Sequence, residues 1–132
     1  MSTDIKTIVS DYIIEDTTLD VTSTGNTTLY TVPAGYRFII DHVDIICGSA
    51  ASTTATVTIG QSTALTDFLD TQTLTNLAAQ YDVVHLYPVP NATPVKTKSY
   101  AAGTIIQIAV TTADADGSSD ASVLLFGYLR AA

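Results

Sequence analysis

The stretch LYTVPAGYRFIIDHVDIIC, residues 29–47, carries the strongest structural signals of the chain. Pro33-Ala34-Gly35 predicts a turn, because Pro33 restricts φ and Gly35 permits backbone conformations that other residues avoid. The β-branched and aromatic residues on both sides of this turn favour strands. The stretch therefore predicts a strand, a turn and then the longest strand of the protein.

The alternation of apolar residues changes phase within that long strand. Phe38 and Ile40 share one parity, whereas Val43, Ile45 and Cys47 share the other. A one-residue bulge at Asp41-His42 would place all five side chains on one face. A strand buried on both faces is the alternative, and it would leave Asp41, His42 and Asp44 in need of partners. We favour the bulge.

The composition fits one β-rich domain. The chain has 132 residues, of which 46% are hydrophobic, only 14% are charged and 23 are Thr. This length supports a single core, and Thr, Val, Ile and Tyr all favour strands. A surface with so few charges is typical of a protein that packs against other proteins.

The charge disfavours nucleic acid and membrane partners. Thirteen acidic residues against five basic ones give a net charge of −8, which repels phosphate backbones and anionic lipids. The longest apolar run, residues 123–129, is too short to span a bilayer. The opening MSTDIKT has no signal-peptide pattern, so we expect synthesis in the cytosol.

No catalytic motif is present in the sequence. The chain has no Gly-x-Ser-x-Gly, no phosphate-binding glycine loop and no Cys-x-x-Cys. Its one cysteine, Cys47, is expected to be a small buried apolar residue on an Ile-rich strand. We therefore expect no enzymatic activity.

Residues 1–16 differ from residues 17–132, which we expect to form one domain. Their apolar residues alternate poorly among several acids, which predicts either irregular edge strands or an arm that lies on a neighbouring subunit. Further strands are predicted at residues 17–22, 27–32, 55–59, 83–89, 95–100, 104–112 and 121–130. Residues 61–81 are expected to be a long polar connection with at most one helical turn, near Leu74, Leu77 and Ala78.

Many short strands and almost no helix predict an all-β protein with an antiparallel β-sandwich. A jelly roll is the preferred version, because the strand number and the long crossing connections suit two Greek keys. An immunoglobulin-like sandwich is the alternative, although it would lack the usual buried Trp and Cys pair.

The last strand has apolar residues on both parities. Leu124, Phe126 and Tyr128 occupy the parity that a half-exposed strand gives to water, so either the same chain or another chain must cover them. Together with apolar residues near the N-terminus they form the predicted interface set: Ile5, Ile8, Val9, Tyr12, Leu124, Phe126 and Tyr128.

Two polar groups are candidate metal sites. Asp114, Asp116 and Asp120 surround Gly117 with a spacing that could bind calcium, although a solvated hairpin loop explains them equally well. His42, Asp44 and His85 are the second group. The cupin family uses a His-x-His pair and a later Glu to hold a metal. The only Glu of this chain lies upstream, at Glu15, so that pattern is broken. Hydrogen bonding of His42 to a neighbouring carboxylate or to a subunit partner is the favoured interpretation.

The sequence resembles small all-β virion proteins of tailed bacteriophages, most closely head decoration (cement) proteins. The likeness rests on Leu-Tyr-Thr-Val-Pro-Ala-Gly before an Ile-rich strand, at residues 29–35, and on the closing Val-Leu-Leu-Phe-Gly-Tyr-Leu-Arg, residues 123–130. It implies a homotrimeric jelly-roll module on the outer capsid surface of the virion. Such a module binds the major capsid protein and stabilises contacts between capsomers, without a cofactor. The alternatives are a tail or head-fibre accessory domain, or a carbohydrate-binding module that stacks tyrosines on sugars.

Overall fold

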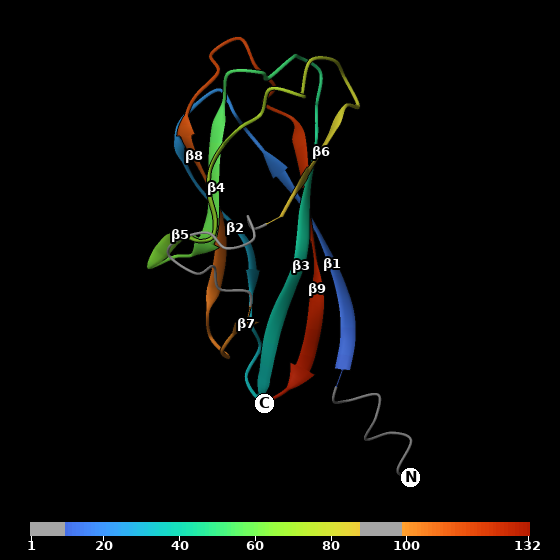
Figure 1. The fold of residues 1–132 in the computed structure, drawn as a ribbon, viewed down its shortest axis with the longest axis vertical. Helices are drawn as coiled ribbons and strands as arrows, with labels where there is room; N and C mark the ends of the chain where they lie inside the picture. The colour runs from blue at the N-terminus through green and yellow to red at the C-terminus, as the bar shows by residue number, and fades with distance from the viewer. Residues whose placement is uncertain (1–9, 88–98) are drawn as a thin grey trace.

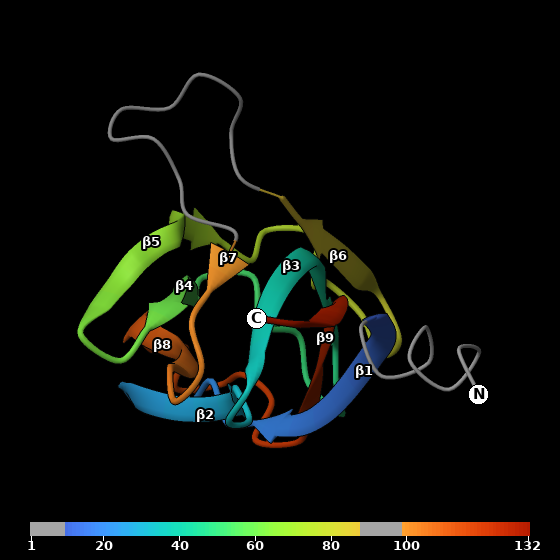
Figure 2. The same ribbon diagram turned by 90° about the horizontal axis from the view of Figure 1, so that it is seen from below.

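The computed structural model describes residues 10–87 and 99–132, which form two antiparallel β-sheets. One sheet has the strand order β1-β9-β3-β6, and the short β7 also pairs with β3. The other has the order β2-β8-β4-β5. Figures 1 and 2 show the sheets as the two layers of a sandwich. The strands are β1 (Ser10–Leu19), β2 (Gly25–Thr31), β3 (Tyr36–Ile46), β4 (Thr56–Gln61), β5 (Ala64–Thr73), β6 (Val83–Leu86), β7 (Ser99–Tyr100), β8 (Ile105–Thr112) and β9 (Ala121–Ala131).

The prediction of an all-β sandwich is confirmed. The chain moves between the sheets at most of its connections, so strands distant in sequence become neighbours, such as β1 with β9 and β2 with β8. This order of two four-stranded paths is compatible with the predicted jelly roll. The described residues contain no helix, and hence none long and apolar enough to cross a membrane.

The predicted turn and bulge are both present. Tyr36 N donates to Pro33 O at 3.3 Å, and Gly35 adopts a φ of +83° that favours glycine. The register between β3 and β9 shifts between Ile40 and His42, which leaves Asp41 as the extra residue. The five apolar side chains separated by the phase change are all buried: Phe38, Ile40, Val43, Ile45 and Cys47.

The core lies between the sheets and uses the inward parity of each strand. The inward residues of β8 and β9 follow the predicted alternation and are buried: Ile106, Ile108, Val110, Ala121, Val123 and Leu125. Ala55, Val57 and Ile59 are also buried, as expected.

The expectation of a long polar connection at residues 61–81 is wrong over its first half. After β4 the chain turns and returns as the strand β5, which pairs with β4. Two register irregularities interrupt this pairing, and Phe68 and Leu69 are both buried although they are adjacent. Bulges of this kind destroy the alternation by which a strand is read from sequence. At Leu74 a tight turn, in which Leu77 N donates to Leu74 O at 3.0 Å, stands where one helical turn was allowed.

The N-terminal strand crosses the boundary predicted at residue 16. β1 pairs with β9 continuously from Ser10 to Leu19, at the edge of its sheet. Residues 1–9 and 88–98 lie outside the described residues. The second range includes the end of the strand predicted at residues 83–89 and most of the strand predicted at residues 95–100.

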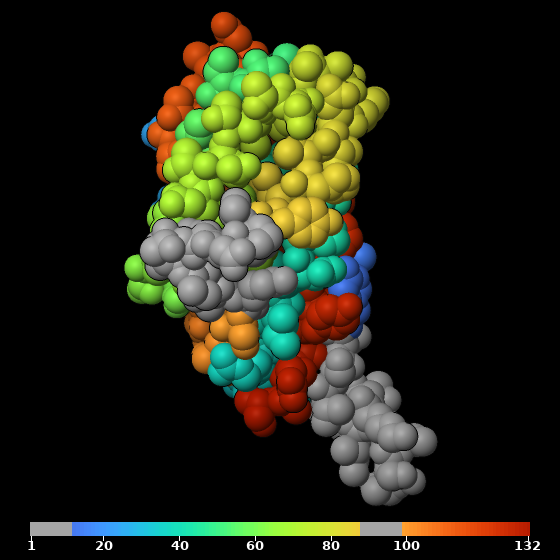
Figure 3. Space-filling model, viewed as in Figure 1, coloured from blue at the N-terminus to red at the C-terminus, as the bar shows by residue number. Residues whose placement is uncertain are grey.

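The β3–β4, β5–β6 and β8–β9 connections meet at one end of the sandwich, where they appear green, yellow and orange-red in Figure 3. Ser52 N donates to Leu77 O at 2.8 Å, and Ser118 N donates to Ser52 Oγ at 3.0 Å. Ser52 and Ser118 are fully buried, so these bonds satisfy polar groups that would otherwise destabilise the fold.

A polar contact also joins the two sheets. The Tyr100 hydroxyl, on β7, donates to Asp67 Oδ1 on β5 at 2.8 Å. Gln61 donates to the same carboxylate through its backbone N at 3.2 Å and its Nε2 at 2.6 Å. Burial and the Asp67 carboxylate raise the pKa of Tyr100, which keeps the hydroxyl protonated as the donor.

We expect Tyr100→Phe to lower the free energy of unfolding by about 1–3 kcal/mol, since it removes a hydrogen bond to a charged group and leaves the ring in place. Chemical denaturation measures the change. Tyr128→Phe is the matched control, because Tyr128 is 45% exposed and lies outside the core. Equal stability of Tyr100→Phe and the unmodified protein would contradict a stabilising role for this contact.

Candidate functional site

The outer face of the β1-β9-β3-β6 sheet is the candidate site. Among the described residues, seven large hydrophobic side chains are exposed, and five of them belong to this face: Tyr12, Ile14, Val83, Tyr87 and Tyr128. Leu124 and Phe126 lie half-buried among them. We call these seven residues, together with Asp16, Asp41, His42, Asp44 and His85, the outer face.

Strand register places these residues in rows across the sheet. Tyr12 on β1 lies opposite Tyr128 on β9, and Ile14 lies opposite Phe126. Phe126 in turn lies opposite His42 on β3. Because the bulge at Asp41 shifts the parity of β3, His42 points outward beside Phe126 while Val43 enters the core.

The aromatic rings of the outer face pack on one another. The His42 ring stacks on Phe126, with centroids 4.3 Å apart and planes at 11°. Its other contact is Tyr87, with centroids 5.4 Å apart and planes at 26°. Tyr12 and Tyr128 meet edge to face at 4.9 Å. These contacts fix the side chains of a water-exposed sheet face in defined positions.

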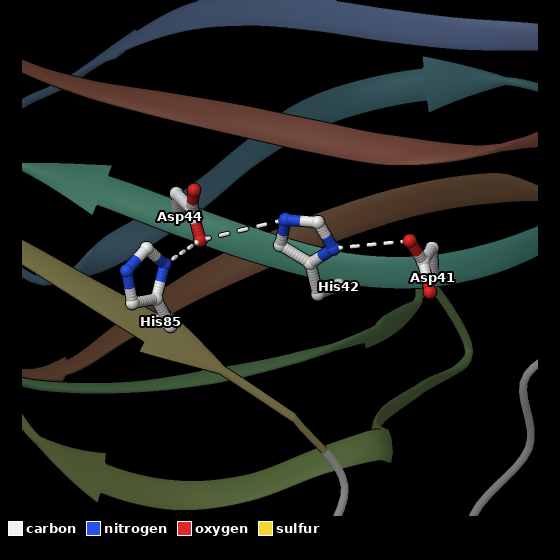
Figure 4. Close-up of polar contacts among 4 residues, drawn as sticks. All are labelled: Asp41, His42, Asp44 and His85. Atoms are coloured by element: carbon white, nitrogen blue, oxygen red, sulfur yellow. Dashed lines mark hydrogen bonds and ion pairs between the residues drawn. The ribbon is translucent and has the colours of Figure 1, made fainter.

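Two carboxylates and two imidazoles form a chain of polar contacts beside the rings (Figure 4). His85 Nδ1 lies 2.6 Å from Asp44 Oδ1, and His42 Nε2 lies 3.7 Å from the same oxygen. His42 Nδ1 lies 3.2 Å from Asp41 Oδ2. An ionised carboxylate only accepts hydrogen bonds, so the His85 nitrogen that faces Asp44 carries a hydrogen. The favoured interpretation of His42, a contact with a neighbouring carboxylate, is what the structure shows.

The structure brings part of the predicted interface set together. Leu124, Phe126 and Tyr128 share the outer face with Tyr12. Tyr12 and Tyr128 are exposed, and Leu124 and Phe126 are half-buried. Ile5, Ile8 and Val9 lie outside the described residues. Ile14, Val83 and Tyr87 were missed, because apolar residues in segments without regular alternation carry no signal of which face they occupy.

The aspartates of the predicted calcium loop have separate roles. Asp120 Oδ1 accepts hydrogen bonds from Ser49 N at 2.9 Å, from Ser49 Oγ at 3.0 Å and from Ser118 Oγ. Asp114 instead accepts from Thr54 N, at 3.4 Å, and from Asp116 N, at 3.2 Å. Within residues 10–87 and 99–132, no three His, Cys, Asp or Glu side chains form a group that could hold a metal ion. Calcium binding by Asp114, Asp116 and Asp120 stays a prediction.

Cys47 is buried at the end of β3, as expected. Its thiol donates to Ala50 O at 3.2 Å, and burial raises the pKa of the thiol. A protonated, buried thiol is a poor nucleophile.

Comparison with solved structures finds the same fold in bacteriophage capsids. A chain of the acidic stable capsid structure of Helicobacter pylori bacteriophage KHP30 aligns with a TM-score of 0.57 and 19% identity, over 92% of this chain and 90% of that chain. A chain of the capsid asymmetric unit of cyanophage Pam1 aligns with a TM-score of 0.58 and 18% identity, over 94% and 87%. At these identities the likeness shows a shared fold. No protein family model matches the chain, and no curated protein matches it.

We expect the loop contact of Asp120 to make stability depend on pH. Hydrogen bonds from Ser118 and Ser49 lower the pKa of Asp120 to about 2. An unfolded Asp titrates near pH ~3.9, so the ionised form stabilises the fold above that pH and its contribution is lost as the pH falls toward the folded value.

Asp120→Asn should therefore melt at a lower temperature than the unmodified protein at pH 7. This gap in melting temperature should close as the pH falls from about 4 toward the pKa of Asp120 in the folded protein, about 2. Thermal melts followed by circular dichroism measure it, with Asp116→Asn as the control for loss of one loop carboxylate. A gap that stays constant across this pH range would contradict the assignment.

Proposed function

We propose that the chain is a structural virion protein that binds the outer surface of a phage capsid and stabilises contacts between capsomers. The fold likeness to chains of two phage capsid structures is the observation that carries the proposal. The alignments cover about nine tenths of both partners in each case, so those chains are of similar length and consist mostly of this one sandwich. A decoration protein of this kind is a small module added to a shell.

The outer face supports the proposal. Exposed apolar patches on a folded protein are typical of surfaces that bind other proteins. Here five of seven exposed large hydrophobic side chains of the described residues gather on one sheet face. A capsid-bound module would cover such a surface, and burial of apolar area would supply binding free energy without catalysis.

The chemistry of the polar residues also fits a passive role. Cys47 is buried and protonated, and the His42 and His85 rings contact carboxylates of the same sheet. We propose that the protein is not an enzyme. The major capsid protein is the proposed partner, and the homotrimer implied by the sequence resemblance stays a prediction.

Particles made with and without the gene for this chain test the proposal. Particles that lack the protein should release DNA at a lower temperature than complete particles, because contacts between capsomers are lost. Purified protein added back should restore the release temperature. Light scattering with a DNA-binding dye measures the release.

Copy number separates a decoration protein from the alternatives. Quantitative mass spectrometry should find the chain in hundreds of copies per particle, since decoration repeats over the shell lattice. A few copies per particle would instead indicate a tail or head-fibre component. Absence from particles, with retention of the free protein on a glycan array, would indicate a carbohydrate-binding module.

A further inference from the structure

The outer face has an apolar centre bordered by carboxylates. Ile14, Phe126 and Tyr128 form the centre with Tyr12, and the side chain of Asp41 beside them is 44% exposed. Asp41 Oδ2 lies 3.2 Å from Nδ1 of His42, whose ring stacks on Phe126, so this negative charge lies close to the rings. The packing around the Tyr12 hydroxyl, and next the Asp41 carboxylate, raise the pKa of Tyr12.

Few cations of residues 10–87 and 99–132 are available to neutralise that border. The described residues hold twelve of the thirteen acidic residues but only two of the five basic ones, Arg37 and Arg130. These two arginines lie opposite each other at one end of the β3–β9 pair, away from Asp44. Arg37 donates to Ser99 Oγ through Nε at 3.1 Å and Nη2 at 3.0 Å. A molecule that covers the centre and brings positive charge to Asp41 and Asp16 would therefore complement this border.

A second copy of this chain does not meet that requirement. A symmetric pair of outer faces would bring the border carboxylates of both chains into one interface, and each chain has a net charge of −8. Like charges placed together in an interface cost several kcal/mol.

A sugar also fits the rings poorly. Sugar stacking needs open ring faces. Here one face of Phe126 packs on the His42 ring, and the His42 ring also packs on Tyr87. The exposed edges of tightly packed aromatic rings suit a protein surface better, since Tyr and other aromatic side chains dominate the energetics of such interfaces.

We infer that the outer face is the surface through which this chain binds the capsid shell, and that the shell presents an apolar patch with an arginine or lysine directed at Asp41. This inference rests on the proposed function and adds the surface and the chemistry of the partner. The half-exposed carboxylate of Asp41 suits a guanidinium or ammonium group, because it accepts charge-assisted hydrogen bonds from such a cation.

Binding of purified protein to shells assembled without it tests the inference. We expect Ile14→Ser and Tyr128→Ser each to weaken co-sedimentation about tenfold or more, as for truncation of a central interface residue. Both side chains are about half exposed, at 54% and 45%, so the fold tolerates the change. Ile105→Ser is the matched control, because Ile105 is an exposed apolar residue of β8 in the other sheet.

The charge is tested separately. Asp41→Asn should weaken binding about tenfold and make it less sensitive to salt, because it removes the carboxylate that the partner's cation contacts. Asp116→Asn removes one charge from an exposed loop position and should bind like the unmodified protein. Circular dichroism melts verify that all variants are folded.

The outcomes separate the inference from the proposed function. If the unmodified protein does not bind shells, the proposed function fails and the inference with it. If it binds and the outer-face variants bind equally well, the inference is overturned and the function stands. Light scattering of the free protein supplies the last outcome. If the outer-face variants form smaller oligomers than the unmodified protein does, a second copy of the chain covers the outer face, which also overturns the inference.

Discussion

The pairing of β3 with β9 through one extra residue determines both faces of the first sheet. Ile40 lies opposite Gly127 and His42 lies opposite Phe126, so Asp41 has no partner position. A shift of one residue exchanges the two faces of a strand. The bulge therefore lets the first half of β3 bury Phe38 and Ile40 while its second half buries Val43 and Ile45.

Gly127 makes this close pairing possible. A Cβ at that position would come within 2.5 Å of both the Ile39 carbonyl oxygen and the Phe38 ring. A side chain would push the two central strands apart at the point where the register changes. The bulge and the glycine opposite it thus form one local arrangement, and the position of His42 beside Phe126 depends on it.

The parts of the fold that the sequence predicts are those whose signal is local. The turn at Pro33 and the inward residues of β8 and β9 follow from turn chemistry and strict alternation. The strand β5 could not be predicted, because its bulges place Phe68 and Leu69 inward together and its remaining residues are mostly polar. The strand β5 is held in place by its pairing with β4 and by the contact between Asp67 and Tyr100. Both interactions depend on residues outside β5.

The sequence predicts individual unusual residues of the candidate site, but not that they lie together. Leu124, Phe126 and Tyr128 are conspicuous on a parity expected to face water, and His42 and Asp44 are conspicuous on an Ile-rich strand. Their meeting on one face depends on registers between strands about 40 to 110 residues apart in the chain, which no single-sequence pattern contains.

The two sheets treat their exposed faces differently, and this contrast argues that the apolar outer face is not a by-product of composition. On the sheet of β2, β8, β4 and β5, outward positions carry Thr and Gln that bond to one another. Thr56 Oγ1 lies 2.7 Å from Thr111 Oγ1, and Gln107 Nε2 donates to Thr28 Oγ1 at 3.2 Å. Thr favours strands as much as Ile or Tyr does and tolerates water, so it would serve equally well on the outer face. Strand formation therefore does not require Ile14, Phe126 and Tyr128 there, and the proposed contact with a capsid would explain them.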